Sequence, residues 1–251
     1  MKILSSLISS IDKDAQVREV IVSTHSTLVC SHHCGISSTI LTSKPHGEEI
    51  IQDAGFLHLK TAKQLANYAL SDNPLEASIG LAAVNSIIES DPGMQIPLDA
   101  TLLVTKLSLS KNVTVVGHFP FIPKVKGAAS QCWVLEQNPI PGEFSTDNAK
   151  DIIPQSDLIV ISGSTLINHT LEELLALCRK EALVMLIGPS TPLSALLFEF
   201  KIGILSGILV EDERQVRKSV SQGAVFRQMQ GIKKVVMIKP QFRPALDGLL
   251  S

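Results

Sequence analysis

Residues 157–178 read DLIVISGSTLINHTLEELLALC, and this stretch decides the fold. It opens with the apolar run Leu158–Ile161, which is short, rich in β-branched residues and typical of a strand buried on both faces of a parallel sheet. We expect the strand to end at Gly163 and a short polar loop to follow. Thr170 and Glu173 then have the T-x-x-E spacing of a capping box, which predicts the start of an amphipathic helix. The stretch is therefore a strand–glycine–loop–helix unit.

The same order of strand and glycine recurs at Val113–Gly117 and at Leu183–Gly188. Strands that alternate with helices predict a doubly wound, Rossmann-like α/β sheet with parallel strands. In such a sheet the turns that follow the strands lie at one edge, where ligands bind. The further elements expected are strands Trp133–Glu136, Ile204–Val210 and Lys234–Ile238, a short helix near Asn148–Ile153, and helices Leu193–Phe200 and Glu213–Arg227.

The first part of the chain has a different pattern. Residues 16–23, 26–31 and 36–41 predict three short strands in an antiparallel meander, and Pro45-His46-Gly47 predicts a turn. Two helices should follow, one from a capping box at Thr61 and one from Asn73-Pro74. The fold class is thus α/β, with a small α+β domain before the Rossmann-like sheet.

The segment from Pro97 to Asn112 has no strong periodicity and is interpreted as a linker. We therefore expect two domains, residues 1–97 and residues 98–251, with the ligand-binding edge in the second.

Composition excludes several classes of protein. The 251 residues are 45% apolar and 18% charged, so a large core is expected. The formal net charge is -2 and no long basic run occurs, which excludes nucleic acid as a partner. No stretch approaches the ~20 apolar residues that span a bilayer, so no membrane association is expected. Four cysteines do not suggest a disulfide framework, which favours a cytoplasmic location. The sequence leaves open whether the chain forms a homo-oligomer.

Three residues near the first strand of the second domain are candidates for ligand binding. Gly117 ends that strand without the G-x-G-x-x-G pattern of a dinucleotide cradle, and His118 next to it could act as an acid, a base or a ligand, or could merely bond a neighbouring loop. Glu136 lies 136 − 117 = 19 positions after Gly117, where an acidic residue binds a ribose hydroxyl in Rossmann proteins. An adenosine-containing ligand therefore stays open, and Glu136 is expected to bind ligand and not to stabilise the fold.

The loops after the other strands supply further candidates. In Gly188-Pro189-Ser190-Thr191-Pro192, Thr191 suits an N-cap and Pro192 the first helical position, which predicts free N–H groups for an anion, although a well-capped helix alone explains the pattern. In the opening stretch, Thr165 and Asn168 lie in the polar loop, and the Asn168 amide can both donate and accept. We expect Gly163 to allow close approach of a ligand to the backbone, the alternative being a positive φ.

Two polar residues interrupt the alanine-rich helix of the first domain. Ser78 and Asn85 are seven residues apart and share one helical face. Buried polar groups are costly unless they are paired. These side chains either bond backbone groups within the first domain or face the second domain across a cleft.

The string Cys30-Ser31-His32-His33-Cys34 carries donors that suit Zn²⁺ and other soft or borderline metals. If strand alternation persists, Cys30, His32 and Cys34 share one face and could bind a metal weakly. The spacing matches no standard zinc finger and no second pair of ligands follows. We therefore predict that the string holds no structural metal, and a solvated hairpin is the simpler interpretation.

Several of these motifs in combination resemble an uncharacterised family described as "putative heavy-metal chelation". The motifs are Ser78-Ile79-Gly80 with Asn85, Gly117-His118-Phe119-Pro120, Glu136, Ser162-Gly163 with Leu166 and Asn168, and Gly188-Pro189-Ser190-Thr191-Pro192. The resemblance covers nearly the whole chain. It implies a domain like the amino-terminal domain of enolase before a Rossmann-like domain, with a ligand site in the cleft between them. The Cys30–Cys34 string is not part of the family pattern.

Two hypotheses of function follow. In the first, the cleft binds a small anionic or metal-chelating compound, or helps to make one. In the second, the chain is an enzyme with a nucleotide-type cofactor, such as S-adenosylmethionine or NAD, held by Gly117 and Glu136. The expected cofactor is thus a transition metal or an adenosine-containing compound. Enolase-like catalysis is disfavoured because it needs a metal-binding barrel domain, and the second half does not have the pattern of a barrel.

Overall fold

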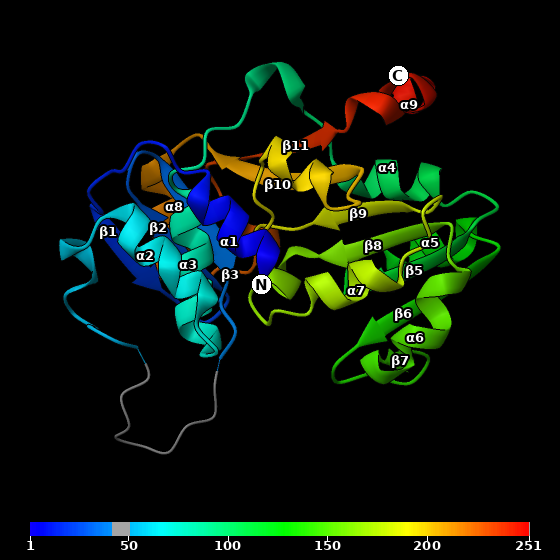
Figure 1. Ribbon diagram of the computed structural model, residues 1–251, viewed down its shortest axis with the longest axis horizontal. Helices are drawn as coiled ribbons and strands as arrows, with labels where there is room; N and C mark the ends of the chain where they lie inside the picture. Colours follow the sequence, from blue (N-terminus) through cyan, green and yellow to red (C-terminus); the bar gives the residue numbers. More distant parts are fainter. Residues whose placement is uncertain (42–50, 251) are drawn as a thin grey trace.

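The computed structural model describes residues 1–41 and 51–250, which form two sheets with helices around both (Figure 1). One sheet has three strands and the other has eight. The α/β class expected from the sequence is confirmed, with a small antiparallel sheet and a larger, mostly parallel one. The turn predicted at Pro45-His46-Gly47 lies outside the described residues.

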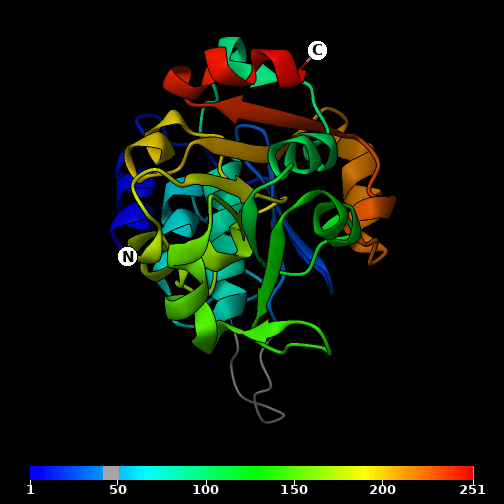
Figure 2. The same cartoon turned by 90° about the vertical axis from the view of Figure 1, so that its right-hand side faces the viewer.

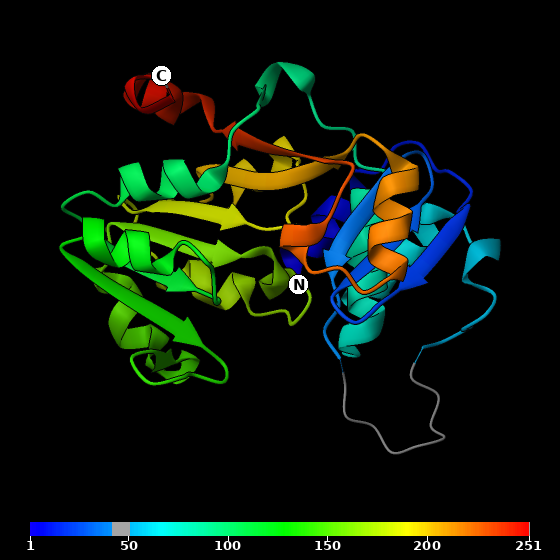
Figure 3. The same cartoon turned by 180° about the vertical axis from the view of Figure 1, so that it is seen from behind.

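The small sheet is the predicted meander, with β1 (Glu19–Val22), β2 (Ser26–Cys30) and β3 (Cys34–Ser38) pairing antiparallel in that order. Helix α3 (Pro74–Asn85) packs on β2 and β3, and α8 (Glu213–Ser221) packs on β1 and β2. The two helices cover opposite faces, as Figures 1 and 3 show together. A helix from the second half of the chain therefore completes the first half's sheet.

The helices of the first half begin where the sequence predicts. The Thr61 side chain and Gln64 form a capping box that starts α2 (Ala62–Ala66), and the Asn73 side chain accepts a hydrogen bond that starts α3. Side chains on every face of α3 are buried, because the helix lies between the small sheet and its neighbours α2 and the 3₁₀ helix Asn67–Leu70. An additional helix, α1 (Lys2–Ser9), buries one apolar face.

The large sheet is parallel from β10 to β7 and ends in two antiparallel strands at its other edge. Its short edge strand β4 precedes residue 98, so the segment 95–96 of the predicted first domain pairs within the second sheet. The spatial order is β4 (Gln95–Ile96), β11 (Ile232–Ile238), β10 (Ile204–Val210), β9 (Leu183–Ile187), β8 (Leu158–Ser162), β5 (Asn112–Val116), β6 (Gln131–Glu136) and β7 (Phe144–Ser145).

Both faces of the large sheet are covered, which is why β8 is apolar throughout. Leu158 and Val160 belong to the apolar cluster under one set of helices, whereas Ile159 and Ile161 belong to the cluster on the other face. Figure 2 shows this sheet end-on, with helices on either side. The helices of the first face are α4 (Ala100–Leu107), α5 (Ile122–Ala128) and α9 (Arg243–Leu250), and those of the second are α6 (Ala149–Ile152) and α7 (Leu171–Leu177).

Three sequence predictions about elements are wrong. The segment predicted as a linker contains α4, which Asp99 caps by accepting the Thr101 N–H. Helix α8 ends at Ser221 and does not reach Arg227, because Gln222 and Gly223 leave the helical conformation. The helix predicted at Leu193–Phe200 is only a 3₁₀ helix, Ala195–Glu199.

The second apolar cluster of the large sheet is continuous with the core of the small one. It holds Ile79 and Leu81 of α3 together with Ile159 and Ile161 of β8. The two sheets are thus fixed against each other by shared burial. Within residues 1–41 and 51–250, no helix combines the length and apolar character needed to cross a membrane.

Candidate functional site

The carboxyl ends of four neighbouring strands bring most of the predicted residues to one edge. Strands β9, β8, β5 and β6 are adjacent and parallel, so Gly188, Gly163, Gly117 and Glu136 follow strand ends on the same side. Chain order reverses between β8 and β5, which makes this edge the topological switch point where open α/β sheets bind ligands.

The three glycines at this edge have two different reasons to be glycine. Gly117 and Gly188 have φ of 111° and 117°, a region that other residues resist. Gly163 has no positive φ, but a Cβ on it would lie 2.8 Å from the Thr191 backbone nitrogen and 3.0 Å from the Ser190 carbonyl carbon. The prediction of close approach at Gly163 therefore needs correcting, since the close neighbour is the chain itself. The positive φ considered as the alternative for Gly163 is instead found at Gly117 and Gly188.

The loop after β9 joins the two sheets and is not the start of a helix. Thr191 donates its N–H to Gly188 O at 3.0 Å, and residues 191–194 form neither helix nor strand. The Ser190 hydroxyl accepts the Ser38 N–H at 2.8 Å and donates to Ser38 Oγ at 3.1 Å. The predicted anion site at a helix N-terminus is therefore absent here, because no α-helix follows Thr191.

The polar loop after β8 is held mainly by its own hydrogen bonds. Thr165 is buried and donates to Ser162 O at 2.7 Å, and Thr170 Oγ1 donates to Asn168 Oδ1 at 2.8 Å. Thr170 makes no side-chain cap bond to α7, so the predicted capping box is wrong. Its hydroxyl instead holds the Asn168 side chain in place through this hydrogen bond. His169, at φ 60°, reaches the first half and donates from Nε2 to Ala69 O at 2.9 Å.

Ser78 and Asn85 have different surroundings. Ser78 is fully buried, donates to Pro74 O at 2.7 Å and accepts the Ile40 N–H at 3.3 Å, so its assignment to the ligand site is wrong. Asn85 Nδ2 donates to Ile36 O at 2.8 Å, whereas its Oδ1 is buried and has no hydrogen-bond partner among the described residues. Asn85 lines a cavity of about 30 Å³ together with Thr191, so it faces the large sheet.

Two hollows open at the switch point. We call the first the cleft cavity; it measures about 620 Å³, and residues of both sheets line it. We call the second the acidic hollow; it measures about 1080 Å³ and lies beside the ends of β5 and β6. His118, Ser162 and Ser164 line both, so the two hollows adjoin. Their volumes are those of small-molecule sites.

The cleft cavity has an apolar wall and a small excess of positive charge. Phe119 and Phe121 stack with ring centroids 4.9 Å apart and both line it. Lys234 lines it and is paired at 2.8 Å with Asp99. Arg227 also lines it and is exposed, with no ion-pair partner in the described part of the chain. Sequence reasoning missed these residues, because Arg227 was placed in a helix and Asp99 in a linker.

The acidic hollow has the opposite charge. Glu136, Asp147 and Glu173 line it against a single cation, Lys150. The predicted residues Gly117, Glu136, Thr165 and Asn168 all line this hollow, whereas Gly188 and Ser190 line the cleft cavity.

His118, between the two hollows, is held by a carboxylate. Its Nδ1 lies 2.7 Å from Glu143 Oε1, and the imidazole is 60% exposed. The Ile140 N–H, which Glu143 Oε2 accepts, and then His118 itself hold the pKa of Glu143 below its ordinary value. The carboxylate therefore orients a ring whose Nε2 bonds no other described residue and can meet a ligand.

We expect Glu136→Gln to leave folding unchanged. Within residues 1–41 and 51–250 the half-buried carboxylate bonds only the adjacent Gln137 N–H, so the free energy of unfolding should stay within about 0.5 kcal/mol of wild type. Urea denaturation measures this. Glu143→Gln is the matched comparison and should cost more, because Glu143 holds both the Ile140 N–H and His118. Severe destabilisation by Glu136→Gln would make Glu136 a structural acid.

Comparison with known proteins shows the family. The family described as "Putative heavy-metal chelation" matches residues 99–239, and a second family model with the same description matches residues 4–88. The chain belongs to this family.

A family member of unknown function from Desulfitobacterium hafniense is 27% identical, with a TM-score of 0.81 over 95% of this chain and 97% of that one. A second family member, from Pyrococcus horikoshii, is 20% identical, with a TM-score of 0.77 over 95% of this chain and 98% of that one. At this identity the comparison shows that the two folds are similar. An uncharacterised protein of Methanocaldococcus jannaschii is 28% identical over 137 residues, 52% of this chain. The match spans 53%, about half, of that relative's length.

The side chains at the switch point do not form a metal centre by themselves. Among the described residues, one group of three His, Cys, Asp or Glu side chains has its donor atoms within 4.8 Å of one another, and it is Cys30, Cys34 and Glu213, outside both hollows. His25 and His118, which line the cleft cavity, are not part of such a group.

The predicted trio Cys30, His32 and Cys34 is wrong as a ligand set. Cys30 and Cys34 are joined in a disulfide, and His32 is exposed. Strand alternation stops at Cys30, because Ser31, His32 and His33 form the turn and Ser31 donates its N–H to His33 O. His33 turns inward instead and donates from Nε2 to Asn85 O at 2.9 Å.

Proposed function

We propose that the cleft cavity binds a small anionic, metal-chelating compound that also has an apolar part, and that the protein handles metal through this compound. The observation that carries the proposal is Arg227, a cation without an ion-pair partner in the described chain, in the same cavity as the stacked rings of Phe119 and Phe121. An anionic group would pair with Arg227, and the apolar part would pack on the rings.

The family description supports this proposal, and the donor chemistry narrows it. The cavity's side chains carry hydroxyl, aromatic and cationic groups, and its one carboxylate, Asp99, is already bound to Lys234. Its two imidazoles, His25 and His118, belong to no group of three metal donors among the described residues. Such a lining suits the oxygen atoms of an organic anion better than a bare cation. The anion would supply the metal ligands, and the protein would recognise the anion.

The test uses native mass spectrometry of the freshly purified chain. We expect a mass excess over the sequence mass that disappears on denaturation, identified by mass spectrometry of the released compound and by elemental analysis. Arg227→Gln should remove the excess. Arg214→Gln is the matched control, since it removes the same charge from an exposed position of α8 outside the cavity. A mass excess that Arg227→Gln leaves unchanged would contradict the assignment.

A second function has its own observation. Gly117 and Glu136 line the acidic hollow together, as a nucleotide-type cofactor bound in a Rossmann-like manner would need. In that case the released compound contains adenosine, and Glu136→Gln weakens its retention whereas Arg227→Gln does not. The two variants thus separate a chelating anion in the cleft cavity from a cofactor in the acidic hollow.

A further inference from the structure

The cysteine pair lies under α8, away from both hollows. Cys30 ends β2 and Cys34 begins β3, directly opposite each other in the hairpin. Both are buried, at 1% and 3% exposure, in an apolar cluster that α8 closes with Val216 and Val220. The pair is therefore where the first half of the chain meets a helix from the second.

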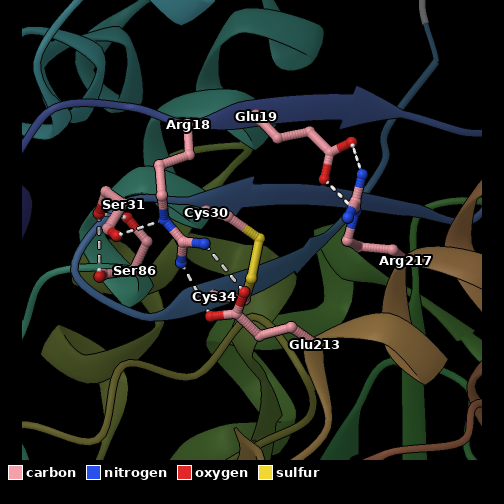
Figure 4. A network of polar contacts seen from close by, with 8 residues as sticks. All are labelled: Arg18, Glu19, Cys30, Ser31, Cys34, Ser86, Glu213 and Arg217. Atoms are coloured by element: carbon pink, nitrogen blue, oxygen red, sulfur yellow. Dashed lines mark hydrogen bonds and ion pairs between the residues drawn. A yellow bond between two sulfur atoms is a disulfide. The ribbon is translucent and has the colours of Figure 1, made fainter.

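A carboxylate from the other half of the chain completes the cluster. Glu213 is the first residue of α8, and its carboxylate oxygen and the two sulfur atoms all lie within 4.8 Å of one another. Arg18 bonds both Glu213 oxygens, at 2.8 and 3.0 Å, and donates to Ser31 O as well. Figure 4 shows the carboxylate and the guanidinium group beside the disulfide.

We propose that, once the disulfide is reduced, Cys30, Cys34 and Glu213 bind one thiophilic divalent cation such as Zn²⁺ or Cd²⁺. A dithiol or phosphine reductant supplies two electrons and is itself oxidised, and the sulfur–sulfur bond breaks as each sulfur gains a proton. The cation then displaces both protons to solvent and forms two metal–sulfur bonds and one metal–oxygen bond. The site is distinct from the cleft cavity, so it does not rest on the proposed function.

The donor set fits such a cation in kind, spacing and charge. Thiolates bind Zn²⁺ at about 2.3 Å and carboxylates at about 2.0–2.2 Å, so donors around one ion lie about 4 Å apart or less. The separations here are within 4.8 Å, and reduction frees the sulfurs to move apart. Two thiolates and Glu213 carry three negative charges, which a divalent cation and Arg18 neutralise. A fourth coordination position stays open to water or to a partner's donor.

Access to the sulfurs is controlled by one exposed ion pair. The side chains of Arg18 and Glu213 are 51% and 42% exposed, and exposed pairs of this kind contribute little to stability. Arg18 bonds the two Glu213 oxygens through separate nitrogens, so it can give up one oxygen to the cation and keep the other. A second ion pair, between Arg217 of α8 and Glu19 of β1, also holds α8 against the small sheet.

The other two cysteines are poor competitors for the cation. Burial raises the pKa of the Cys178 thiol to about 11 and also raises the pKa of Cys132. Neither thiol belongs to a group of three metal-donor side chains in the described part of the chain, whereas Cys30 and Cys34 lie together with Glu213. Cys132 and Cys178 are also present in every sample compared below, so their contribution cancels.

The experiment compares one preparation in two redox states. Half of the purified full chain is reduced with a phosphine, freed of reductant without air, and titrated with Cd²⁺ while ultraviolet absorption follows thiolate-to-cadmium charge transfer. The other half is titrated oxidised. We expect one tightly bound Cd²⁺ per chain in the reduced sample and none in the oxidised one. Equal binding in both states, or none in the reduced state, would overturn the proposal.

Two variants test the ligand set. In the reduced state, Glu213→Gln should weaken Cd²⁺ binding by at least about tenfold, because it replaces the charged carboxylate ligand with a neutral amide oxygen, and even the loss of an outer-shell partner costs that much. Glu19→Gln is the matched control: it breaks the neighbouring ion pair with α8 without touching the sulfurs, and should leave the affinity unchanged. Cys30→Ser/Cys34→Ser should abolish the charge-transfer band. If that double variant does not fold, the two redox states of wild type still decide. If Glu213→Gln and Glu19→Gln lose Cd²⁺ affinity equally, Glu213 is not a ligand.

Discussion

Gly80→Ala should destabilise the chain by more than about 3 kcal/mol, above the 1–3 kcal/mol usual for an overfilled core. Gly80 lies inside α3, where a Cβ would stand 1.8 Å from the Ala69 backbone nitrogen and 2.4 Å from the Tyr68 carbonyl carbon. Both are main-chain atoms of the 3₁₀ helix Asn67–Leu70, which cannot rotate away as a side chain would. The new methyl group must therefore push two helices apart.

Gly127→Ala is the matched control for this substitution. Gly127 is also helical, in α5, and a Cβ there meets nothing within 4 Å. Alanine is a better helix former than glycine by up to about 1 kcal/mol, so this variant should be as stable as wild type or more so. Urea denaturation of both variants measures the difference. Equal stability of the two would mean that α3 has room to move.

The Gly80 contact also reinterprets part of the family resemblance. Ser78-Ile79-Gly80 was grouped with the ligand-binding motifs, but Ser78 bonds backbone groups of its own half and Gly80 admits a neighbouring helix. A motif shared by a family can thus record close packing as well as chemistry. Sequence alone does not separate the two, because both demand a small residue at a fixed position.

Local patterns predicted local structure well in this chain. The capping box at Thr61 and the Asn73-Pro74 helix start are present, and the apolar run Leu158–Ile161 is a central strand. Each depends on neighbouring residues alone. The Thr170 prediction failed because its hydroxyl found a partner in Asn168, two residues away, which competes with the cap.

What the sequence did not reveal depends on residues far apart in the chain. Cys30 and Cys34 were assigned to a weak metal site or to a solvated hairpin, because nothing nearby in the sequence indicates that Val216 and Val220 of α8 bury them. Helix α8 ends early, before Gly223 with its φ of 72°. Arg227 therefore lies beyond the helix, where it lines the cleft cavity. The switch point, by contrast, follows from the order of strands, and its glycines were found.

The last prediction concerns Gly163, where the structure changes the expected result. Sequence reasoning predicts that Gly163→Ala folds normally and only loses ligand. The contact of its Cβ position with the Thr191 backbone nitrogen, at 2.8 Å, instead predicts a loss of roughly 1–3 kcal/mol in the free energy of unfolding. The loop of Ser190 should shift as well, because Ser190 is the neighbour that anchors this edge to Ser38. Any compound retained in the cleft cavity should therefore be lost too.

A second substitution separates this steric cause from strain in the backbone. Thr191 Oγ1 also lies 2.8 Å from the Cβ position of Gly163, so Thr191→Ala should recover part of the stability lost in Gly163→Ala. Gly188→Ala is the control, since its φ of 117° and its open surroundings make its cost, about 1 kcal/mol, one of conformation alone. Thr191→Ala should not recover the stability that Gly188→Ala loses. Urea denaturation of wild type, the three single variants and the two double variants that contain Thr191→Ala gives both couplings. If the Gly163→Ala protein is as stable as wild type, the chain has room for the methyl group, and close approach of a ligand again explains why this residue is glycine.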